Sequence, residues 1–526
     1  MTIRSLTPAL SVSPQIDPAD VVALAASGFR SIVCNRPDGE EAGQPTAAAI
    51  AAAAEAHGLR FVHIPVMSGG IDEGDVAKMA RALADLPAPV LAYCRSGARS
   101  EQLAGMASAR GADGSVAHYD IIVIGGGSAG IATAASILRR RPGVSIAIVE
   151  PCADHYYQPG FTMVGGGIFA AEATRRDEAG LIPAGAEWVR GAAASFDPAS
   201  DRVTLADGRV LGYRALIVCP GLKLDWDAIP GLAGALGADG VTSNYRYDLA
   251  PYTDRLVRRF RGGRALFTQP PMPIKCAGAP QKAMYLSCHR WERAGLLGQA
   301  EVQFHTATPS LFGVAAYVPA LEAYIARYAV DLQLESRLVS IDGPAKVALF
   351  EQRRGDAVRR VEERFDMIHV VPPQVAPEFI ASSPLAAPSG FVAVDEATLR
   401  HSVYANVFAL GDVAATTNAK TAAAARKQAP VVALNALAAL DGAPPVAAYD
   451  GYGSCPLTVE AGKIVLAEFG YGGKLLPTFP KWMIEGTRPS RISWLLKEKI
   501  LPPVYWHGML RGREWLAAPA PIGSGA

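Results

Sequence analysis

The sequence lacks several patterns that would quickly assign it to a common class of protein. Its 526 residues carry a formal net charge of +1, so electrostatics give no reason to expect a nucleic-acid partner. The seven cysteines are scattered singly, without a C-x-x-C pair or a zinc-type Cys/His spacing, and we expect neither a metal site nor a disulfide scaffold. No apolar signal-peptide core opens the chain, and no apolar run is long enough to span a bilayer. These absences predict a cytoplasmic protein in a reducing compartment.

Two α/β units of unequal size are present. Residues 1–110 alternate apolar strands with Ala-rich helices, which is typical of a small βα domain. Residues 111–118 are small and polar and predict a linker, and a second unit is expected over 119–526. In the first unit we expect strands over 28–35, 60–66 and 88–94, and helices over 44–58 and 72–86.

A glycine-rich turn opens the second unit. The stretch IIVIGGGSAG (121–130) follows a strand and precedes an Ala-rich helix, and the next strand ends in the acid Glu150. Such a turn lets a pyrophosphate approach the helix N-terminus, while the acid binds ribose hydroxyls. The residues expected to bind a dinucleotide are Gly125, Gly126, Gly127, Ser128, Ala129 and Gly130.

The segment NVFALGD (406–412) favours FAD as that dinucleotide. An apolar strand ends in Gly411 and Asp412, and a long helix follows. This pattern resembles the second flavin fingerprint of flavoproteins with two dinucleotide-binding domains. In those proteins the Asp binds the ribityl chain of FAD. Lys420, near the start of the following helix, is a cation of the kind that stabilises a reduced flavin.

The strand and turn that would hold NAD(P)H carry no glycine fingerprint. Residues 262–280 have proline and cysteine in its place, and a proline-rich turn cannot supply the row of N–H donors that a pyrophosphate needs. NAD(P)H is therefore disfavoured as electron donor. Cys276 follows Lys275 and precedes an expected helix, a setting that favours a thiolate.

Six motifs together resemble one enzyme family, the sulfide:quinone oxidoreductases, most closely their mitochondrial-type branch. The motifs are VEPCADHYYQPGFTMVGGG, PIKCAGAPQKAMYLS, NVFALGD, KTAAAA, YDGYGSCPL and LPPVYWHGMLRG, all within residues 119–515. The resemblance implies a second nucleotide-type subdomain at about 240–375, sulfide as substrate, sulfane sulfur carried on Cys276 and quinone as electron acceptor. It also implies FAD contacts from Glu150, Gln158, Ala193, Asp412 and Lys420.

One position departs from the family pattern. The resemblance implies a second redox cysteine directly after Gly411-Asp412, but this chain has Val413 there. Cys288 lies 12 residues further along the expected helix, roughly 18 Å from Cys276 at 1.5 Å per residue. Cys152 is expected on the adenosine side of the flavin, and Cys219 is a weak candidate. To Cys455 we assign a structural role and no chemistry.

Three readings follow for the second unit. In the first, Cys276 accepts sulfur and passes it to an external thiol such as glutathione, or to Cys94 in the first unit. In the second, sulfide oxidation is lost, and the flavin unit oxidises a different thiol or persulfide or acts as a plain quinone reductase. In the third, the protein is a non-enzymatic persulfide-binding or sensing module that keeps FAD for structure.

The region from about 450 to 515 is the expected contact with quinone and membrane. Its part 479–515 mixes Trp, Tyr and Leu with seven Lys and Arg residues, a composition that suits an element lying on a lipid surface. We therefore expect peripheral contact with the inner face of the cell membrane. The alternative is an ordinary amphipathic segment packed on the protein's own core.

In the first unit, the stretch PVLAYCRSGARS (89–100) reads as a strand, a loop that starts at Cys94, and a helix. Loop N–H groups and the helix dipole would favour a thiolate and hold an anion. Tyrosine-phosphatase-like enzymes place an Arg six residues after the Cys, whereas here Arg99 stands five after it, which favours the shorter loop of rhodanese-like sulfurtransferases.

The first unit also resembles a known small-domain family. The stretches LSVSPQI, NRPDGEE, IPV and YCRSGARS within residues 5–105 are similar to the beta-lactamase-hydrolase-like phosphatase or sulfurtransferase domains, whose fold is like a dual-specificity phosphatase. A phosphatase would also need a general acid. The candidates are Asp38, Asp72 and Asp75, and the sequence does not choose among them. Phosphatase activity stays open beside sulfur transfer.

Overall fold

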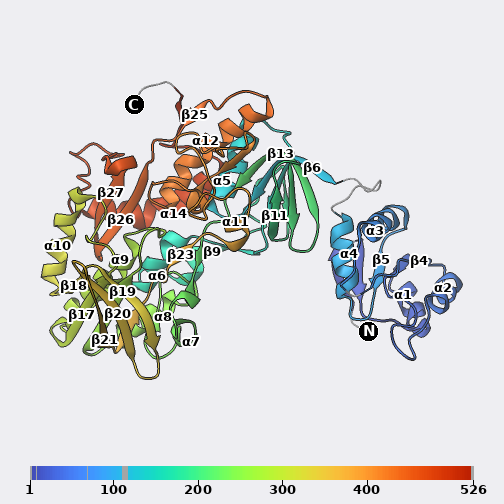
Figure 1. Ribbon diagram of the computed structural model, residues 1–526, viewed down its shortest axis with the longest axis horizontal. Coiled ribbons are helices and arrows are strands. Elements are labelled where there is room, and N and C mark those ends of the chain that lie inside the picture. Colours follow the sequence, from blue (N-terminus) through green and yellow to red (C-terminus); the bar gives the residue numbers. More distant parts are fainter. Residues whose placement is uncertain (1–2, 8, 68, 109–115, 523–526) are drawn as a thin grey trace. The chain divides into compact units, whose positions relative to one another are not determined.

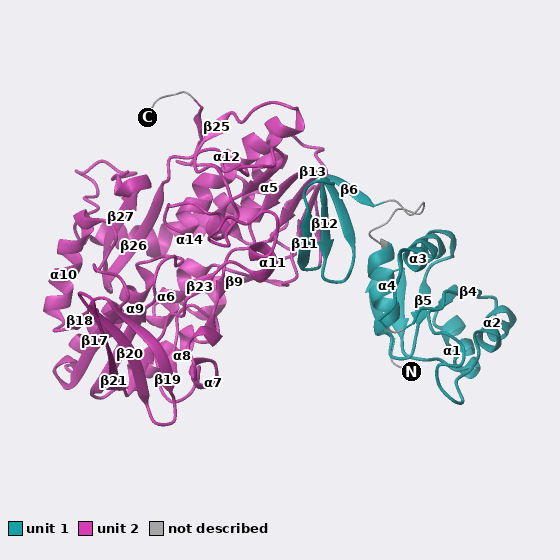
Figure 2. Ribbon diagram, viewed as in Figure 1, with its two compact units in different colours: residues 1–119, 191–213 teal, residues 120–190, 214–526 magenta. Residues whose placement is uncertain are grey.

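The chain folds into two compact units. The computed structural model describes residues 3–7, 9–67, 69–108 and 116–522. The units, coloured separately in Figure 2, are Met1–Tyr119 with Gly191–Tyr213, and Asp120–Arg190 with Arg214–Ala526. Residues 111–115 of the predicted linker, and 109–110 before it, lie outside the described residues.

The first unit is built on a five-stranded sheet of order β1-β2-β5-β3-β4, in which β1 is antiparallel and the other four strands are parallel (Figure 1). The central strands β3 and β5 bury every residue, as expected for parallel strands covered on both faces. The strands are β1 (Arg4–Thr7), β2 (Leu10–Ser13), β3 (Ser31–Cys34), β4 (Arg60–His63) and β5 (Val90–Tyr93). The helices are α1 (Val21–Ala26), α2 (Ala47–Ala56), α3 (Glu73–Asp85) and α4 (Ala98–Ser108).

Neighbouring residues of β3 show how the first unit forms its two cores. Ile32 packs with residues of α1 and α2, while Val33 packs with residues of α3 and α4. Successive side chains of a strand point to opposite faces, so the apolar run of β3 is buried by helices on both sides. The strands and helices predicted for this unit are confirmed. The unit also holds the antiparallel strands β11 (Ala193–Asp197) and β12 (Arg202–Leu205) and the first residues of β13 (Val210–Val218).

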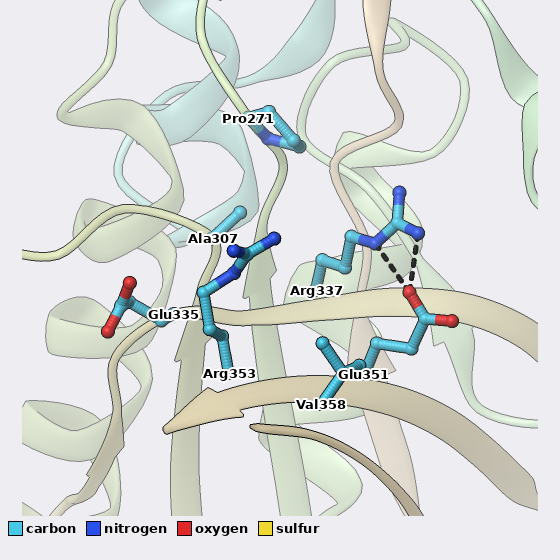
Figure 3. Close-up of a pocket in the computed structure, with 7 residues that line it drawn as sticks. All are labelled: Pro271, Ala307, Glu335, Arg337, Glu351, Arg353 and Val358. Atoms are coloured by element: carbon cyan, nitrogen blue, oxygen red, sulfur yellow. Dashed lines mark hydrogen bonds and ion pairs between the residues drawn. The ribbon is translucent and has the colours of Figure 1, made fainter. Parts of the chain in front are cut away.

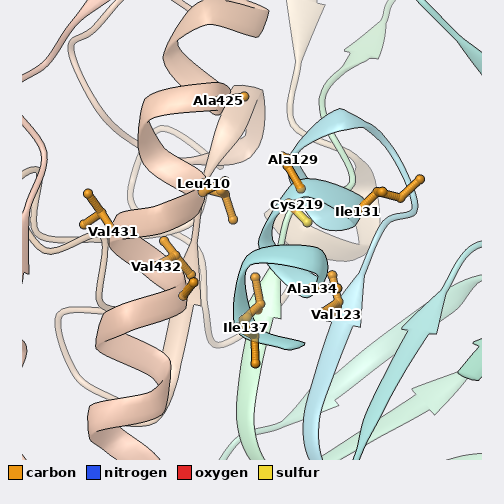
Figure 4. Packing of buried hydrophobic residues seen from close by; sticks show 14 of the residues in the cluster. Val123, Ala129, Ile131, Ala134, Ile137, Cys219, Leu410, Ala425, Val431 and Val432 are labelled. Carbon is orange, nitrogen blue, oxygen red and sulfur yellow. The ribbon is translucent and has the colours of Figure 1, made fainter. Parts of the chain in front are cut away.

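The second unit begins with a parallel Rossmann-type arrangement. Strands β10, β7 and β6 are adjacent and parallel, and β13 pairs in parallel with β24. Helices α5 and α12 bury Ala, Val and Ile side chains against each other and against this sheet (Figure 4). The elements are β6 (Ala117–Ile124), α5 (Ser128–Arg140), β7 (Ile146–Val149), β10 (Ala186–Val189), β24 (Val407–Ala409) and α12 (Ala422–Leu440).

A second parallel sheet follows in the same unit, with strand order β15-β22-β16-β17-β18. Its strands are β15 (Val241–Thr242), β16 (Gly263–Gln269), β17 (Ala300–Thr306), β18 (Asp331–Gln333) and β22 (Met367–His369). Helices α8 (Ala250–Arg259), α9 (Ala279–Arg293) and α10 (Val318–Arg327) accompany it, and so does an antiparallel meander of β19 (Ser336–Asp342), β20 (Val347–Arg354) and β21 (Ala357–Arg364). The predicted α/β class is confirmed.

A hairpin and a broken helical segment end the chain. The hairpin strands are β26 (Gly453–Glu460) and β27 (Lys463–Phe469), and β26 lies against α9 in one apolar core. Helix α13 (Arg491–Leu495) is followed by two π-helical turns, Leu496–Ile500 and Val504–Gly508. Such turns are rare and occur often at functional sites.

Candidate functional site

The glycines of the turn after β6 are required by close packing. Gly125 has φ +106, and a Cβ there would lie 2.7 Å from the carbonyl oxygen of Cys219. A Cβ on Gly130 would collide with the carbonyl oxygen of Gly125. Gly127 caps α5 and has no atom within 4 Å of its Cβ position. The turn is therefore tight on its inner side and open where a pyrophosphate would approach the helix.

Glu150, at the end of β7, is held against this turn. Its Oε2 accepts from the Gly126 N–H at 2.8 Å, and its Oε1 accepts from the Cys152 N–H at 2.8 Å. The buried Glu178, next to Gly126, has one oxygen without a hydrogen-bond partner. An open glycine edge with an acid at the ribose position and an unpaired buried oxygen fits a bound dinucleotide.

The second flavin motif lies beside the first. Gly411 has φ +74 and donates its N–H to Gln428 Oε1 at 2.8 Å, and a Cβ added to it would lie 3.4 Å from Ala129 on α5. Asp412 follows it and is half-buried. Loss of hydration raises the pKa of the Asp412 carboxyl, while the charges of Lys275 and Lys420 oppose that rise.

Three predicted site residues, Cys276, Gln158 and Lys420, meet beside Lys275. The Cys276 N–H donates to the carbonyl oxygen of Lys420 at 2.8 Å, and Lys275 Nζ donates to Gln158 Oε1 at 2.6 Å. Lys420 is buried, and its Nζ donates to the Ala414 carbonyl at 2.8 Å. Cys276, the candidate for the reactive thiol, therefore lies beside the residues expected to bind the flavin.

Ala193, the remaining predicted flavin contact, is a buried residue at the start of β11, paired with Leu205. Nothing in its surroundings tests the expected contact, which stays a prediction.

Cys276 is in the left-handed region at φ +50, where residues other than glycine are uncommon and strained. Lys282 Nζ, buried one turn into α9, donates to Cys276 Sγ at 3.1 Å. The pKa of the Cys276 thiol lies well below its usual range, first because the Cys455 thiol donates a hydrogen bond to it. The charges of Lys282 and Lys497 act in the same direction, and burial opposes them.

Cys455 is the functional candidate that sequence reasoning missed. It lies on β26 with no exposed surface, and it shares the apolar core against which Cys276 packs. Its pKa is raised well above the usual range because it keeps the proton that it shares with Cys276 and because it is buried. The only sequence signal was its position inside the motif YDGYGSCPL.

The C-terminal segment has one inward cation and an apolar outer side. Lys497 is 4% exposed, and its Nζ donates to the Pro159 carbonyl at 3.3 Å. Burial lowers the pKa of the Lys497 ammonium to about 7. Large apolar side chains of the same region are exposed: Leu475, Trp482, Met483, Ile492, Leu495, Ile500, Trp515 and Leu516. Within the described ranges, no helix combines the length and apolarity needed to cross a membrane.

Where a nicotinamide nucleotide would be expected to bind, the structure has a cavity partly lined by prolines. Two adjoining hollows of about 380 and 490 Å³ lie at the carboxyl end of β16, and both include Pro271. Arg337 and Glu351 form an ion pair in the smaller one, with Arg353 close by (Figure 3). Whether NAD(P)H is excluded stays a prediction.

In the first unit, Cys94 and Arg99 lie where the sequence predicts a nucleophile loop. Cys94 is buried at the end of β5, and its sulfur accepts from the Gly97 N–H at 3.2 Å. The Arg99 guanidinium donates to the Val66 carbonyl at 2.5 Å and to Glu40 at 2.7 Å. Glu40 also pairs with the buried Arg36. The loop N–H group therefore faces the sulfur, while Arg99 is held by a carboxylate.

The three candidate general acids all have local structural partners. Asp38 accepts from the Ala47 N–H at 2.7 Å at the start of α2. Asp72 and Asp75 form a reciprocal capping box at the start of α3. Each carboxylate thus accepts from backbone N–H groups at the start of a helix.

Two Rossmann-type sheets with a glycine turn, a Gly-Asp motif and a half-buried thiol define the second unit as a flavoprotein-type oxidoreductase with two dinucleotide-binding domains. Comparison with known proteins identifies the family. The chain is 39% identical over 396 residues to the mitochondrial sulfide:quinone oxidoreductase of Dictyostelium discoideum, covering 75% of this chain and 86% of the relative. It is 35% identical to the mouse enzyme of the same name, covering 75% and 87%. The chain belongs to the sulfide:quinone oxidoreductase family.

Structure comparison agrees on the fold. The sulfide:quinone oxidoreductase of Aquifex aeolicus superposes with a TM-score of 0.64 at 20% identity, over 76% of this chain and 92% of that one. Residues 2–111 match the family model for the phosphatase-like domain of beta-lactamase hydrolase-like protein. Both relationships predicted from the sequence are confirmed. The two relatives in the preceding paragraph are named as mitochondrial proteins, which conflicts with the cytoplasmic location that we predict.

Proposed function

We propose that the second unit oxidises sulfide with quinone as electron acceptor and carries the sulfane sulfur on Cys276. The observation that carries the proposal is the thiolate site: Cys276 lies against Lys282 and is hydrogen-bonded to Lys420 beside the Gly411-Asp412 motif. A thiolate is the nucleophilic form of cysteine in sulfur chemistry. Membership of an enzyme family favours this function over the non-enzymatic reading and over a quinone reductase without sulfide oxidation.

FAD is the cofactor that these residues fit. We propose that the open edge of Gly127 and the carboxylate of Glu150 hold its pyrophosphate and ribose, that Asp412 binds its ribityl chain, and that Gln158 and Lys420 approach its ring. When bound, FAD supplies a two-electron acceptor between the thiol and quinone. The buried cation of Lys420 would stabilise negative charge there, as expected of a preorganised charge in a water-poor site.

The acceptor of the sulfur is proposed to be glutathione or another small thiol. Cys276 is half-buried, and we propose that a small anion reaches its sulfur. Quinone is proposed to enter from a lipid surface beside the exposed apolar residues of the C-terminal segment, which implies peripheral membrane contact.

Turnover by the full-length holoprotein tests this function. Purified protein mixed with sulfide and a water-soluble quinone should bleach the oxidised flavin spectrum and form quinol. The Cys276→Ser variant should keep the flavin and lose both changes. An oxidised spectrum that sulfide leaves untouched, with and without glutathione, would overturn the proposal.

For the first unit we propose sulfur transfer through Cys94. The loop offers an N–H donor to the Cys94 sulfur, and Asp38, Asp72 and Asp75 are each engaged at a helix start, which leaves no obvious general acid among the three candidates. Thiocyanate formation from thiosulfate and cyanide should be lost in Cys94→Ser. Phosphate release from an aryl phosphate that depends on Cys94, without any sulfur transfer, would overturn this assignment.

A further inference from the structure

The segment that carries Cys276 packs directly against β26, the strand that carries Cys455. A Cβ added to Gly278 would collide with the side chain of Leu457, so the start of α9 lies directly against β26. Both sulfurs belong to one apolar core, Cys455 inside it and Cys276 at its edge. The pKa values of the two thiols are shifted in opposite directions by each other, down for Cys276 and up for Cys455. A disulfide needs Cα atoms within about 7 Å, a separation that two segments packed against each other in one core can provide.

Buried positive charge surrounds this pair. Lys282 and Lys497 are 3% and 4% exposed, and Lys282 Nζ lies 3.1 Å from Cys276 Sγ. Buried charges are costly unless they meet an opposite charge. Two inward ammonium groups beside two thiols therefore indicate a site built to hold negative charge on sulfur.

Of the other cysteines of this unit, Cys219 and Cys288 are placed for packing, and Cys152 is exposed beside Glu150. Cys219 Sγ points to the Gly125 carbonyl at 3.6 Å, in the core of the first sheet. Cys288 is fully buried two-thirds of the way along α9, and burial raises its pKa. Val413, at the position where the resemblance implies the second redox cysteine, has no exposed surface and no sulfur.

We propose that Cys455 is the second redox thiol of this protein and forms a disulfide with Cys276 in the resting enzyme. The inference deepens the proposed function and rests on it for turnover, but the disulfide itself is a property of the chain that can be measured separately. Cys276 is the sulfur that sulfide reaches, because it is half-buried while Cys455 has no exposed surface.

The sulfur chemistry balances in three steps. Hydrosulfide attacks Cys276 Sγ, the Cys276–Cys455 bond breaks, Cys455 leaves as a thiolate beside Lys282, and the hydrosulfide proton is lost. An external thiolate then takes the outer sulfur from Cys276, and Cys276 leaves as a thiolate. The two thiolates finally give up two electrons and re-form the disulfide. The electrons reduce quinone, which takes two protons, so hydrosulfide, thiolate, quinone and one proton yield a persulfide anion and quinol.

Peptide mapping under non-reducing conditions tests the disulfide in the full-length holoprotein. Air-oxidised wild-type protein should give one cross-linked peptide pair that joins Cys276 to Cys455, and the pair should be absent in Cys455→Ser. After one equivalent of sulfide, the Cys276 peptide should carry one extra sulfur atom while Cys455 becomes reactive to alkylation. Mapping that finds both cysteines free in oxidised protein, or a link from Cys276 to another cysteine, would overturn the inference.

Turnover of matched variants separates this inference from the function it rests on. Cys455→Ser should lose quinone reduction by about 100-fold or more, as Cys276→Ser does, because residues that act as one unit fail together. Cys288→Ser, a buried thiol of the same core, should stay within about twofold. Full activity in Cys455→Ser would contradict a redox role for Cys455 but not the proposed sulfide oxidation. An inactive wild-type protein would contradict sulfide oxidation, and peptide mapping would then still show whether the Cys276–Cys455 disulfide forms.

A second variant guards against the case in which Cys455→Ser loses activity because it misfolds. Cys455→Ala serves as the second variant because it leaves no unpaired hydroxyl in the apolar core. Its flavin absorbance and melting temperature show whether the fold is intact. Intact Cys455→Ala with wild-type turnover would also overturn the inference.

Discussion

At the scale of single residues, the site depends on where charge is buried. Lys282 lies within hydrogen-bond distance of Cys276 Sγ, and the Cys455 thiol donates to the same sulfur. An opposite charge and a hydrogen bond both favour the ionised form, whereas burial disfavours it. For Cys276 the first two effects exceed the third, because its pKa lies well below that of an ordinary thiol.

Removing the Lys282 charge should weaken this thiolate. In Lys282→Met the pH midpoint of Cys276 alkylation should rise by roughly 1–2 pH units, since an opposite charge within a few ångströms lowers a pKa by about that much. The measurement is the rate of iodoacetamide labelling of Cys276 against pH in reduced protein. Lys474→Met, which removes an exposed lysine of the same unit, is the control. An unchanged midpoint in Lys282→Met would contradict a direct charge effect.

Lys497 should make stability depend on pH. Its ammonium has a pKa of about 7 in the folded protein against 10.5 when unfolded, so the unfolded state binds more protons between these values and stability rises with pH there. Lys497→Met should lose this slope. It should gain about 2–3 kcal/mol at pH 7, after the cost of an unpaired Pro159 carbonyl, and about 2 kcal/mol less than that at pH 9.

Urea unfolding of both proteins at pH 7 and pH 9 measures the two gains. A Lys497→Met protein that is less stable than wild type at pH 7 would show that the ammonium contributes more through its partners than it loses by burial.

At the scale of elements, short sequence patterns predicted the strands, turns and helices that depend mainly on neighbouring residues. The buried apolar run of β3, the glycine turn before α5 and the helix after Cys276 each follow from neighbouring residues.

The contact between Cys276 and Cys455 had no such local signal. It forms because β26 packs on α9, and the packing of segments far apart in the chain is set by the complementarity of whole faces rather than by any short motif. Lys497 was likewise read as one of seven cations on a surface, but the π-helical turn that contains it points it inward. The second sulfur and the second buried cation of the site were therefore beyond sequence reasoning.

The C-terminal segment should bind lipid through its exposed apolar side chains. Trp482 is 82% exposed and Leu495 is 52% exposed, and burying such side chains in a bilayer interface is favourable. The double variant Trp482→Ser with Leu495→Ser should bind anionic vesicles about tenfold more weakly in a sedimentation assay. Val403→Ser, which removes an apolar side chain that is 74% exposed outside the segment, is the control. Equal weakening by Val403→Ser would mean that apolar exposure anywhere suffices.

At the scale of the whole molecule, the chain holds two cysteine sites in separate units, Cys94 in the first and Cys276 in the second, for both of which we propose sulfur chemistry. Each unit has its own sheet and its own buried core, so each site is positioned by its own unit. If the second unit releases its sulfur to a small thiol, the persulfide can diffuse and needs no fixed path to Cys94. The first unit would then act on the product of the second even when the two belong to different molecules.

A mixing experiment with two full-length variants tests this diffusible hand-over. Wild-type protein given sulfide, quinone, glutathione and cyanide should form thiocyanate. Cys276→Ser alone should stay at the rate without enzyme, and Cys94→Ser alone should give only the slower direct reaction of cyanide with the persulfide that it makes. An equimolar mixture of the two variants should restore thiocyanate formation, because one variant supplies glutathione persulfide and the other transfers its sulfur. Omitting glutathione should abolish this rescue. If the mixture stays inactive while the wild type works, sulfur passes from Cys276 to Cys94 only within one chain.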